Sequence, residues 1–301
     1  MGGMGLVAGA GWGALGSRQC QMGDNAQHAK TESALALRVA LAPLVATADI
    51  AVNARVIAAA IRAAVAAGAQ VLLTPECGLC GYPSAARAGL DDVNRCALAE
   101  AEDALLMQAE RAGLVLVLGS AECVSAECGP AGWTNDAVIG GAVSATRYHK
   151  RHLTPGDRDH FQSGTRAVVI AHAGWRLGLA ICYDLRAAPV MAALAQADAN
   201  AFLVIAHMAG VDPEPGVKAT LIPQLCAVRA AEWATPLAFC NTAAPDAWCA
   251  SSAWDARGMA LPSTSHGALF MVDLPARSSH PDWYQRVRED HLTQWATPAQ
   301  T

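Results

Sequence analysis

Three reactive side chains each lie at or just past the end of a predicted β-strand. Glu76 follows QVLLTP, Lys150 follows ATRYH, and Cys182 closes RLGLAIC. In open α/β sheets, ligand sites are built where strands end. A thiol can attack a carbonyl carbon, a carboxylate can carry a proton, and an ammonium group can stabilise developing negative charge. Taken singly, each residue also has a structural explanation, as a solvated loop carboxylate, a surface Lys–Arg pair or a thiol in an apolar core.

The sequence around each residue is more specific than the residue itself. The block AGAQVLLTPE ends at Glu76 and is followed by Gly-Tyr-Pro at 81–83. The block YHKRHL contains Lys150, with a Phe-x-x-Gly at 161–164, and the block GLAICYDLR contains Cys182. In this order, the three blocks resemble the nitrilase superfamily of carbon–nitrogen hydrolases. The resemblance extends over about residues 37–275.

The resemblance implies a reaction and a role for each residue. Cys182 would attack an amide carbonyl to form a thioester, while Glu76 takes the thiol proton, protonates the departing amine or ammonia, and later activates water. Lys150 would stabilise the oxyanion with the backbone N–H of Tyr183, and its charge would lower the pKa of the Cys182 thiol. No metal or organic cofactor is implied.

Asp157 is a fourth candidate for the active site. It occupies the place of the family's second acid, which is commonly Glu, and the resemblance puts that acid near the nucleophile. A competing interpretation is local: Gly-Asp-Arg-Asp at 156–159 is a turn composition, and Asp in turns usually bonds its own backbone.

The residues after the nucleophile bear on the substrate. Tyr-Asp at 183–184 is more common among the amidases of the family, whereas nitrilases often continue with Trp-Glu, so we expect a small amide. The candidates for substrate binding are Tyr82, Tyr183, Arg186 and His207. Arg186 could instead pair with a structural carboxylate, and His207 could cap a strand.

Other functions remain open at this point. The same site could hydrolyse a nitrile or an N-carbamoyl compound, and a non-catalytic binding protein could use this fold. A metal or redox protein could use Cys77-x-x-Cys80. A zinc site would need a second ligand pair, for which Cys123 and Cys128 are poorly spaced. We therefore interpret Cys77 and Cys80 as buried or incidental thiols.

The elements that must position these residues alternate along the chain. Strands are predicted over 37–43, 70–74, 114–118, 168–171, 176–182, 202–206, 236–240 and 268–272, with two more within 135–148 joined by a Gly140-Gly141 turn. Helices are predicted over 97–112, 189–197 and 221–234, after a first helix capped by Asp49 and ended by Gly68. The alternation indicates an α/β fold, which the resemblance specifies as a four-layer α-β-β-α sandwich of two mixed β-sheets covered by helices.

The chain as a whole has 301 residues, of which 53% are hydrophobic, and a formal net charge of −5 without a long basic run. We therefore expect no nucleic-acid partner, and we expect no membrane span because Arg, Gly or Pro interrupts the apolar stretches. Residues 1–36 are predicted to be a flexible N-terminal tail, and residues 37–301 the carbon–nitrogen hydrolase domain.

The ten cysteines bear on location, and the apolar residues after the Cys182 block and in the C-terminal tail bear on assembly. Without a recognisable signal peptide, we expect cytoplasmic thiols. The resemblance implies a homodimer or larger homo-oligomer. The residues expected at this interface are Val190, Met191 and Leu194, together with Trp283 and Trp295 of a C-terminal tail that also carries Tyr284.

Overall fold

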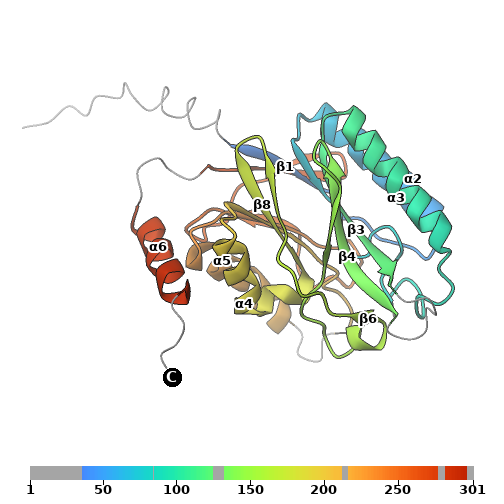
Figure 1. The fold of residues 1–301 in the computed structure, drawn as a ribbon. Helices are drawn as coiled ribbons and strands as arrows, with labels where there is room; N and C mark the ends of the chain where they lie inside the picture. Colours follow the sequence, from blue (N-terminus) through green and yellow to red (C-terminus); the bar gives the residue numbers. More distant parts are fainter. Residues whose placement is uncertain (1–35, 84, 125–131, 212–215, 277–281, 297–301) are drawn as a thin grey trace, which may run out of the picture.

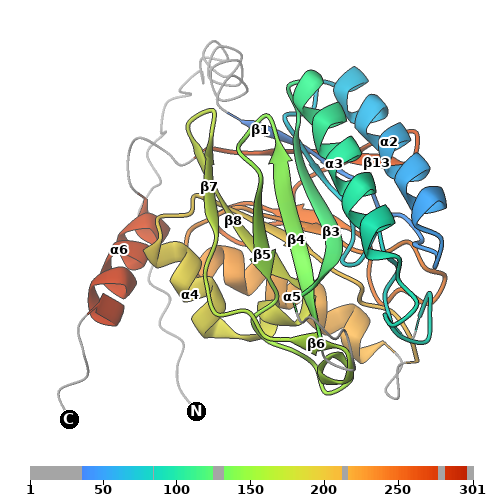
Figure 2. The same ribbon diagram turned by 45° about the vertical axis from the view of Figure 1, so that its right-hand side comes forward.

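The computed structural model describes residues 36–83, 85–124, 132–211, 216–276 and 282–296. Two mixed sheets lie face to face, and helices cover the outer side of each sheet (Figures 1 and 2). The four-layer α/β sandwich predicted from the sequence is confirmed. The predicted N-terminal tail lies outside the described residues, except for Ala36. Within the described ranges, no helix is long and apolar enough to cross a membrane.

The first sheet has eight strands in the order β12-β13-β1-β2-β3-β4-β5, and β6 pairs with β4. Strands β1, β2 and β3 run parallel, and the remaining neighbours along this order are antiparallel. The strands are β1 Leu37–Leu41, β2 Val71–Leu73, β3 Val115–Cys123, β4 Trp133–Gly141, β5 Thr146–His149, β6 Phe161–Gln162, β12 Thr264–His266 and β13 Leu269–Leu274.

The second sheet has five strands in the order β11-β10-β9-β8-β7. Its three central strands are parallel, and an antiparallel strand closes each edge. The strands are β7 Val169–His172, β8 Trp175–Ile181, β9 Ala201–Ile205, β10 Leu237–Cys240 and β11 Ser252–Trp254.

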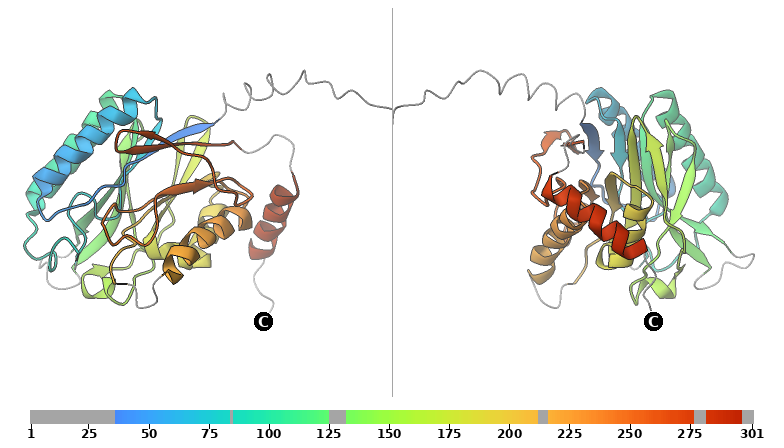
Figure 3. Two further views of the ribbon diagram at one scale, coloured as in Figure 1. Left: turned by 180° about the vertical axis from the view of Figure 1, so that it is seen from behind. Right: turned by 60° about the vertical axis from the view of Figure 1, so that its left-hand side comes forward.

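Helices α2 (Ile50–Ala66) and α3 (Arg95–Arg111) cover the first sheet, and α4 (Ala188–Gln196) and α5 (Val217–Glu232) cover the second (Figure 3). The predicted cap of α2 is present, since the Asp49 side chain accepts from the N–H groups of Ala51 and Val52 at 2.8 and 3.0 Å. Two short 3₁₀ helices, η1 (Asp157–Asp159) and η2 (Cys182–Arg186), carry site residues.

The core explains why the central strands are apolar on both faces. Val39 and Leu41 of β1 point into the cluster between the sheets, whereas Ala40 points into the cluster under α2 and α3. Strands covered on both faces have no solvated side and lose the polar alternation of an exposed sheet.

One local prediction is wrong, and three short strands were not predicted. Strand β4 continues through Gly140 and Gly141, and the turn follows them. A Cβ at these two positions would meet α3, 2.9 Å from Leu106 Cδ2 and 2.9 Å from Ala109 Cβ respectively, so the glycines permit close helix–sheet packing. The short strands β6, β11 and β12 were not predicted, because two or three residues carry no periodicity.

Val190, Met191 and Leu194 are fully buried within the chain, so they belong to its core and cannot form an intersubunit contact. The C-terminal segment predicted as a tail forms helix α6 (Trp283–Ala296). The prediction that the cysteines are thiols holds for seven described residues and fails for Cys123, which is disulfide-bonded.

Candidate active site

The nucleophile candidate lies on a sharp turn between β8 and η2. Cys182 has a φ of 51°, a left-handed conformation that costs a non-glycine residue free energy, and 8% of its surface is exposed. The buried Asp184 carboxylate holds the turn by accepting from Ile181 N–H at 3.0 Å and from Tyr148 O–H at 2.7 Å. The backbone turn therefore fixes the thiol at the end of β8.

Glu76 lies just past β2, where it is buried and receives three hydrogen bonds. Its Oε1 accepts from Lys150 Nζ at 2.6 Å and from Asn135 Nδ2 at 2.7 Å. Its Oε2 accepts from the backbone N–H of His207 at 2.8 Å. These donors stabilise an ionised carboxylate in the interior.

Asp157 meets the same ammonium group from the other side. Lys150 Nζ donates to Asp157 Oδ2 at 2.8 Å, and Tyr82 O–H donates to Asp157 Oδ1 at 2.5 Å. Asp157 also accepts from the backbone N–H of Thr154 at 2.9 Å, so both interpretations of this residue describe real contacts. The side chains of Glu76, Lys150 and Asp157 form one buried ionic chain.

Burial and charge together set the protonation of this chain. Burial alone would lower the pKa of Lys150, but the carboxylates of Glu76 and Asp157 raise it well above its ordinary value. Burial opposes ionisation of Asp157, yet Lys150 and the Tyr82 hydrogen bond outweigh it and lower the pKa of Asp157. Lys150 is accordingly an ammonium group and Asp157 a carboxylate at neutral pH.

The pKa of the Cys182 thiol differs from the sequence-based expectation that Lys150 would lower it. Burial and the charge of Glu76 raise the pKa of Cys182 well above its ordinary value, although Lys150 acts in the opposite direction. The nucleophile candidate therefore rests as a thiol, and it would need a base to remove its proton as it attacks. Glu76 is a hydrogen-bond partner of this thiol.

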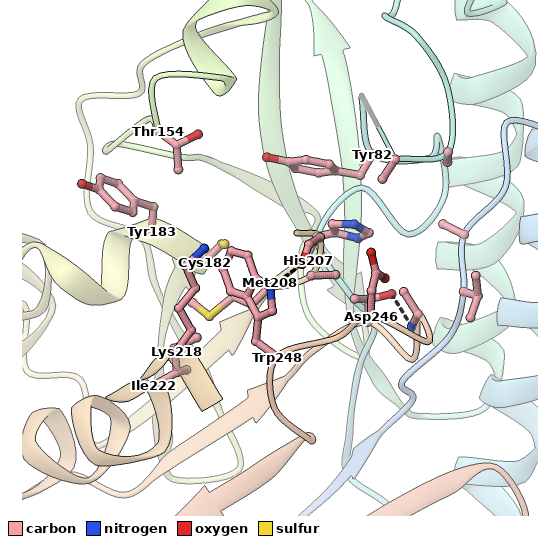
Figure 4. A pocket seen from close by; sticks show the side chains of 18 of the residues that line it. Tyr82, Thr154, Cys182, Tyr183, His207, Met208, Lys218, Ile222, Asp246 and Trp248 are labelled. Carbon is pink, nitrogen blue, oxygen red and sulfur yellow. Dashed lines mark hydrogen bonds between the residues drawn. The ribbon is translucent and has the colours of Figure 1, made fainter. Parts of the chain in front are cut away.

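A cavity of about 750 Å³ opens onto Cys182 (Figure 4). All four predicted substrate-binding residues line it: Tyr82, Tyr183, Arg186 and His207. The Tyr82 and His207 rings stack with centroids 4.5 Å apart and planes 7° apart, and the Arg186 guanidinium lies 6.0 Å from the Tyr183 ring centroid. His207 thus presents its ring to the cavity while its backbone N–H bonds Glu76, and burial lowers the pKa of the ring.

Residues 36–277 match the family model described as carbon-nitrogen hydrolase. The chain belongs to the carbon–nitrogen hydrolase family.

Amidases are among the proteins that this chain is similar to. An (R)-stereoselective amidase from Pseudomonas sp. is 30% identical over 153 residues, which are 51% of this chain and 53% of the relative. The match therefore spans about half the length of that relative. An amidase structure from Nesterenkonia sp. is 26% identical with a TM-score of 0.67, and the alignment covers 86% of this chain and 96% of that chain.

Further structures of the Nesterenkonia sp. AN1 amidase, which is of the nitrilase superfamily, hold small amides. In one, acrylamide has added to the active-site cysteine; it is 26% identical, with a TM-score of 0.68 over 86% of this chain and 99% of that chain. Another is in complex with butyramide; it is 26% identical, with a TM-score of 0.66 over 86% of this chain and 97% of that chain. The family resemblance seen in the sequence is confirmed.

Sequence reasoning missed several polar residues of this hydrolase site. Asn135 bonds Glu76 from within β4, and Asp184 also accepts from the N–H groups of Arg151 and His152 at 3.1 and 2.8 Å, next to Lys150. The dipeptide Asn-Asp at 135–136 interrupts a largely apolar strand. Polar residues at buried strand positions need hydrogen-bond partners, so this dipeptide could have indicated a polar site.

Two other clusters of reactive side chains lie outside the lining of the cavity. Cys77 and Cys80 are buried free thiols, and neither lines the cavity. Glu122, Asp136 and His149 place possible metal-ligand atoms within 4.8 Å of one another. Arg147 already supplies a cation there, since it pairs with Asp136 at 2.9 Å and with Glu122 at 3.5 Å.

Proposed function

We propose that this carbon–nitrogen hydrolase cleaves a small non-peptide amide through a thioester on Cys182, releasing ammonia or an amine. The observation that carries the proposal is that Cys182 lines the cavity and has Glu76 and Lys150 as charged neighbours, with these two groups hydrogen-bonded to each other at 2.6 Å. The amidases among its relatives support the same reaction class.

In the acylation half, the Cys182 sulfur bonds the carbonyl carbon as its proton passes to Glu76. The carbonyl oxygen gains the negative charge, which Lys150 Nζ and the Tyr183 backbone N–H stabilise. The C–N bond then breaks, and Glu76 returns the proton to the departing nitrogen. One such oxyanion donor is typically worth about 3 kcal/mol of transition-state stabilisation.

In the deacylation half, Glu76 takes a proton from water as the water oxygen attacks the thioester carbon. The C–S bond breaks, the carboxylic acid leaves, and Cys182 regains its proton. Two easier steps thus replace one difficult attack of water on an amide.

The charges explain why the site can remain buried during this cycle. The Lys150 ammonium and the Asp157 carboxylate balance each other, and Glu76 contributes one negative charge. When Glu76 takes the thiol proton, that charge moves to the substrate oxygen beside Lys150. The net charge of the pocket stays constant, so no step requires transfer of an additional charge into the protein interior.

The cavity walls favour a small molecule with an apolar portion. Met208, Ile222, Leu225 and Trp248 line it together with the aromatic candidates Tyr82 and Tyr183. Arg186 at the rim supplies a positive charge. An acyl group carried on an apolar stem fits these walls, with Tyr82, Tyr183, Arg186 and His207 as the binding residues.

An ammonia-release screen tests the proposal over small amides, ω-amides, N-carbamoyl compounds and nitriles. We expect release from amides by the wild type, no turnover by Cys182→Ala, and continued turnover by Cys77→Ala. In Glu76→Gln, the Cys182 sulfur should displace fluoride from fluoroacetamide and retain an acetamide moiety, which mass spectrometry of a digest would locate. Turnover by Cys182→Ala combined with an inactive Cys77→Ala would overturn the assignment. Release from nitriles or N-carbamoyl compounds alone would change the substrate class.

We also propose a homo-oligomer. Its support is a set of exposed apolar side chains on neighbouring helices, namely Val217, Leu221 and Val228 on α5 and Trp283 on α6, which is 62% exposed. Exposed apolar residues gathered on one face are typical of interfaces. Static light scattering at micromolar concentration checks this, and a monomer mass would contradict it.

For location, we propose the cytoplasm, because the described cysteines other than Cys123 are free thiols, including the nucleophile. The disulfide at Cys123 is the observation against it. Thiol labelling of this residue in intact cells and in oxidised extracts tests the proposal. A fully oxidised Cys123 in freshly lysed cells would contradict it.

A further inference from the structure

Asn135 lies in the middle of β4 and touches both charged residues of the proposed triad. Its side-chain Nδ2 donates to Glu76 Oε1 at 2.7 Å. Its backbone carbonyl accepts from the backbone N–H of Lys150 at 2.8 Å. The residue is fully buried, so one position in a rigid strand anchors the general base by its side chain and the oxyanion donor by its main chain.

The hydrogen bonds to Glu76 are distributed unequally between its two oxygens. A carboxylate oxygen offers two lone-pair sites in the plane of the group. Both sites of Oε1 are used, by Lys150 at 2.6 Å and by Asn135 at 2.7 Å. Among the described N–H donors, Oε2 receives that of His207 at 2.8 Å, which leaves it one lone pair for the proton of the thiol.

We propose that Asn135 is a positioning residue that saturates Oε1 of Glu76 and thereby directs the proton transfers of the cycle through Oε2. This inference rests on the proposed function and adds a residue and an atom to it. Without the Asn135 donor, Oε1 would also accept a proton, and in that state the proton would lie on the oxygen that Lys150 holds. The carboxylate would then be less ionised at a given pH, because a hydrogen bond to its charged form has been lost.

The choice of an amide at this position supports a role in the site. Its Oδ1 is buried and receives no hydrogen bond from the described part of the chain. An unpaired buried polar atom costs free energy, so packing alone would favour an apolar side chain such as Leu. The orientation of the amide is fixed by its partner, because an ionised carboxylate can accept from Nδ2 and cannot donate to Oδ1. A charged donor at this place would place a second cation beside Glu76, whereas an amide binds it without added charge.

The first test is Asn135→Leu, which removes the donor and keeps the volume and the backbone carbonyl. We expect kcat/KM to fall about tenfold or more through kcat, with a small change in KM. The acid limb of the pH profile should move to higher pH, because the base must still be ionised to act. Thr134→Val is the matched control: it alters the adjacent buried hydroxyl, which bonds Glu122 O at 3.4 Å, and should leave rate and profile unchanged.

The second variant, Asn135→Asp, gives the opposite pH dependence. A protonated carboxyl group has the shape of the amide and supplies an O–H donor, but its ionised form can only accept. This variant should be active at low pH and lose activity at an alkaline limb well below that of the wild type. Opposite movements of the two profiles support the proposal. If both variants keep the wild-type pH profile, the proposal is wrong. This holds both for fully active variants and for variants that lose activity together with thermal stability.

The positioning role of Asn135 and the proposed function can be tested separately by a reaction that cleaves no carbon–nitrogen bond. Alkylation of Cys182 by iodoacetamide, followed by mass spectrometry across pH, reports the thiol and its base directly. If no amide is hydrolysed by the wild type but the alkylation profile moves in Asn135→Leu, the proposed function fails and the positioning role stands. If amides are hydrolysed and the alkylation profile of Asn135→Leu equals the wild type, the positioning role is wrong and the function stands.

Discussion

Lys150 is a buried cation with two roles, one in the ion pairs of the fold and one in the proposed catalytic cycle. Its ammonium pairs with Glu76 and Asp157 at 2.6 and 2.8 Å, and in the proposed cycle it also receives the oxyanion. Such a cation is stable in the interior only because both carboxylates are present. Removing it leaves two close carboxylates, which cannot both stay ionised.

We predict that Lys150→Gln lowers kcat at least about 100-fold, with a smaller effect on KM. Gln supplies an N–H donor without charge, so the developing oxyanion loses its main electrostatic partner. The variant should also unfold at a lower temperature, because a buried pair has been broken. Steady-state kinetics and thermal melts measure the two effects. A change confined to KM would mean that Lys150 only binds substrate.

Asp157 is tested by Asp157→Asn, which keeps the shape and removes the charge. We predict an activity loss of at least about tenfold and an acid limb moved to lower pH, because one fewer negative charge then opposes the ionised base. The measurement is the pH dependence of kcat/KM. If Asp157 served only the turn through Thr154, Asn would replace it with little loss and the profile would not move.

The same carboxylate should make stability depend on pH. The pKa of Asp157 is lowered in the folded protein below its ordinary value of 3.8, so its ionised form stabilises the fold above that value. This contribution is lost as the pH falls through the lowered pKa. We therefore predict that wild-type stability falls more steeply with acid than that of Asp157→Asn in urea titrations below about pH 4. Parallel curves would contradict an ionised Asp157 in the fold.

At the scale of the elements, β3 supports the strand end that carries Glu76. Gly119 N–H donates to Thr74 Oγ1 at 3.0 Å, and its carbonyl accepts from Leu79 N–H at 2.9 Å. A Cβ at Gly119 would lie 1.9 Å from the Pro75 carbonyl oxygen. The glycine therefore lets the turn that carries Glu76 rest directly on the strand.

We predict that Gly119→Ala lowers the free energy of unfolding by about 3 kcal/mol and reduces kcat, since the clash is with backbone and Glu76 must shift. Gly156→Ala is the matched control, because a Cβ there meets nothing within 4 Å. Urea unfolding and kinetics of both variants provide the test. Equal stability of the two variants would show that the turn can move aside at little cost.

An element could be predicted when its own residues carry the signal, and could not when the signal depends on residues distant in the sequence. Buried strands and their ends could be predicted, because the segment QVLLTP and the segment RLGLAIC carry their own apolar pattern. The prediction of a turn at Gly140-Gly141 was wrong. The same dipeptide occurs in tight turns and at close helix–sheet contacts, and only the position of α3 distinguishes the two. Asn135 could not be assigned a role, because its partner Glu76 lies 59 residues away, just past another strand.

At the scale of the whole molecule, the site exists only where the two sheets meet. Glu76 and Lys150 follow strands of the first sheet, and Cys182 and His207 follow strands of the second. Asp184 joins them, since it bonds Tyr148 O–H of the first sheet and Ile181 N–H of the second. The apolar interface between the sheets therefore sets the distance between the proposed nucleophile and the proposed base.

Helix α6 lies beyond residue 277, where the family match ends, and it lies next to α5 (Figure 3). The buried guanidinium of Arg288 ties it to the ends of α4 and α5. Arg288 is 3% exposed and donates to the carbonyls of Trp233 and Ala199 at 2.8 and 3.0 Å. It also donates to Thr235 Oγ1 at 2.5 Å and to the Ala195 carbonyl at 3.2 Å. These acceptors lie at and just after the ends of α4 and α5, where carbonyls lack helical partners.

We predict that Arg288→Met lowers the free energy of unfolding by about 2–4 kcal/mol, because several buried carbonyls lose their donor while the apolar stem is kept. The kcat should stay within about twofold of the wild type, since Trp233, Thr235, Ala195 and Ala199 do not line the cavity. Arg286→Met, at an exposed position of the same helix, is the control and should cost less than about 0.5 kcal/mol. Urea unfolding followed by tryptophan fluorescence measures both variants. Equal stabilities would show that α6 is held by its other contacts, and a large loss of kcat in Arg288→Met would show that the ends of α4 and α5 transmit strain to the nucleophile turn.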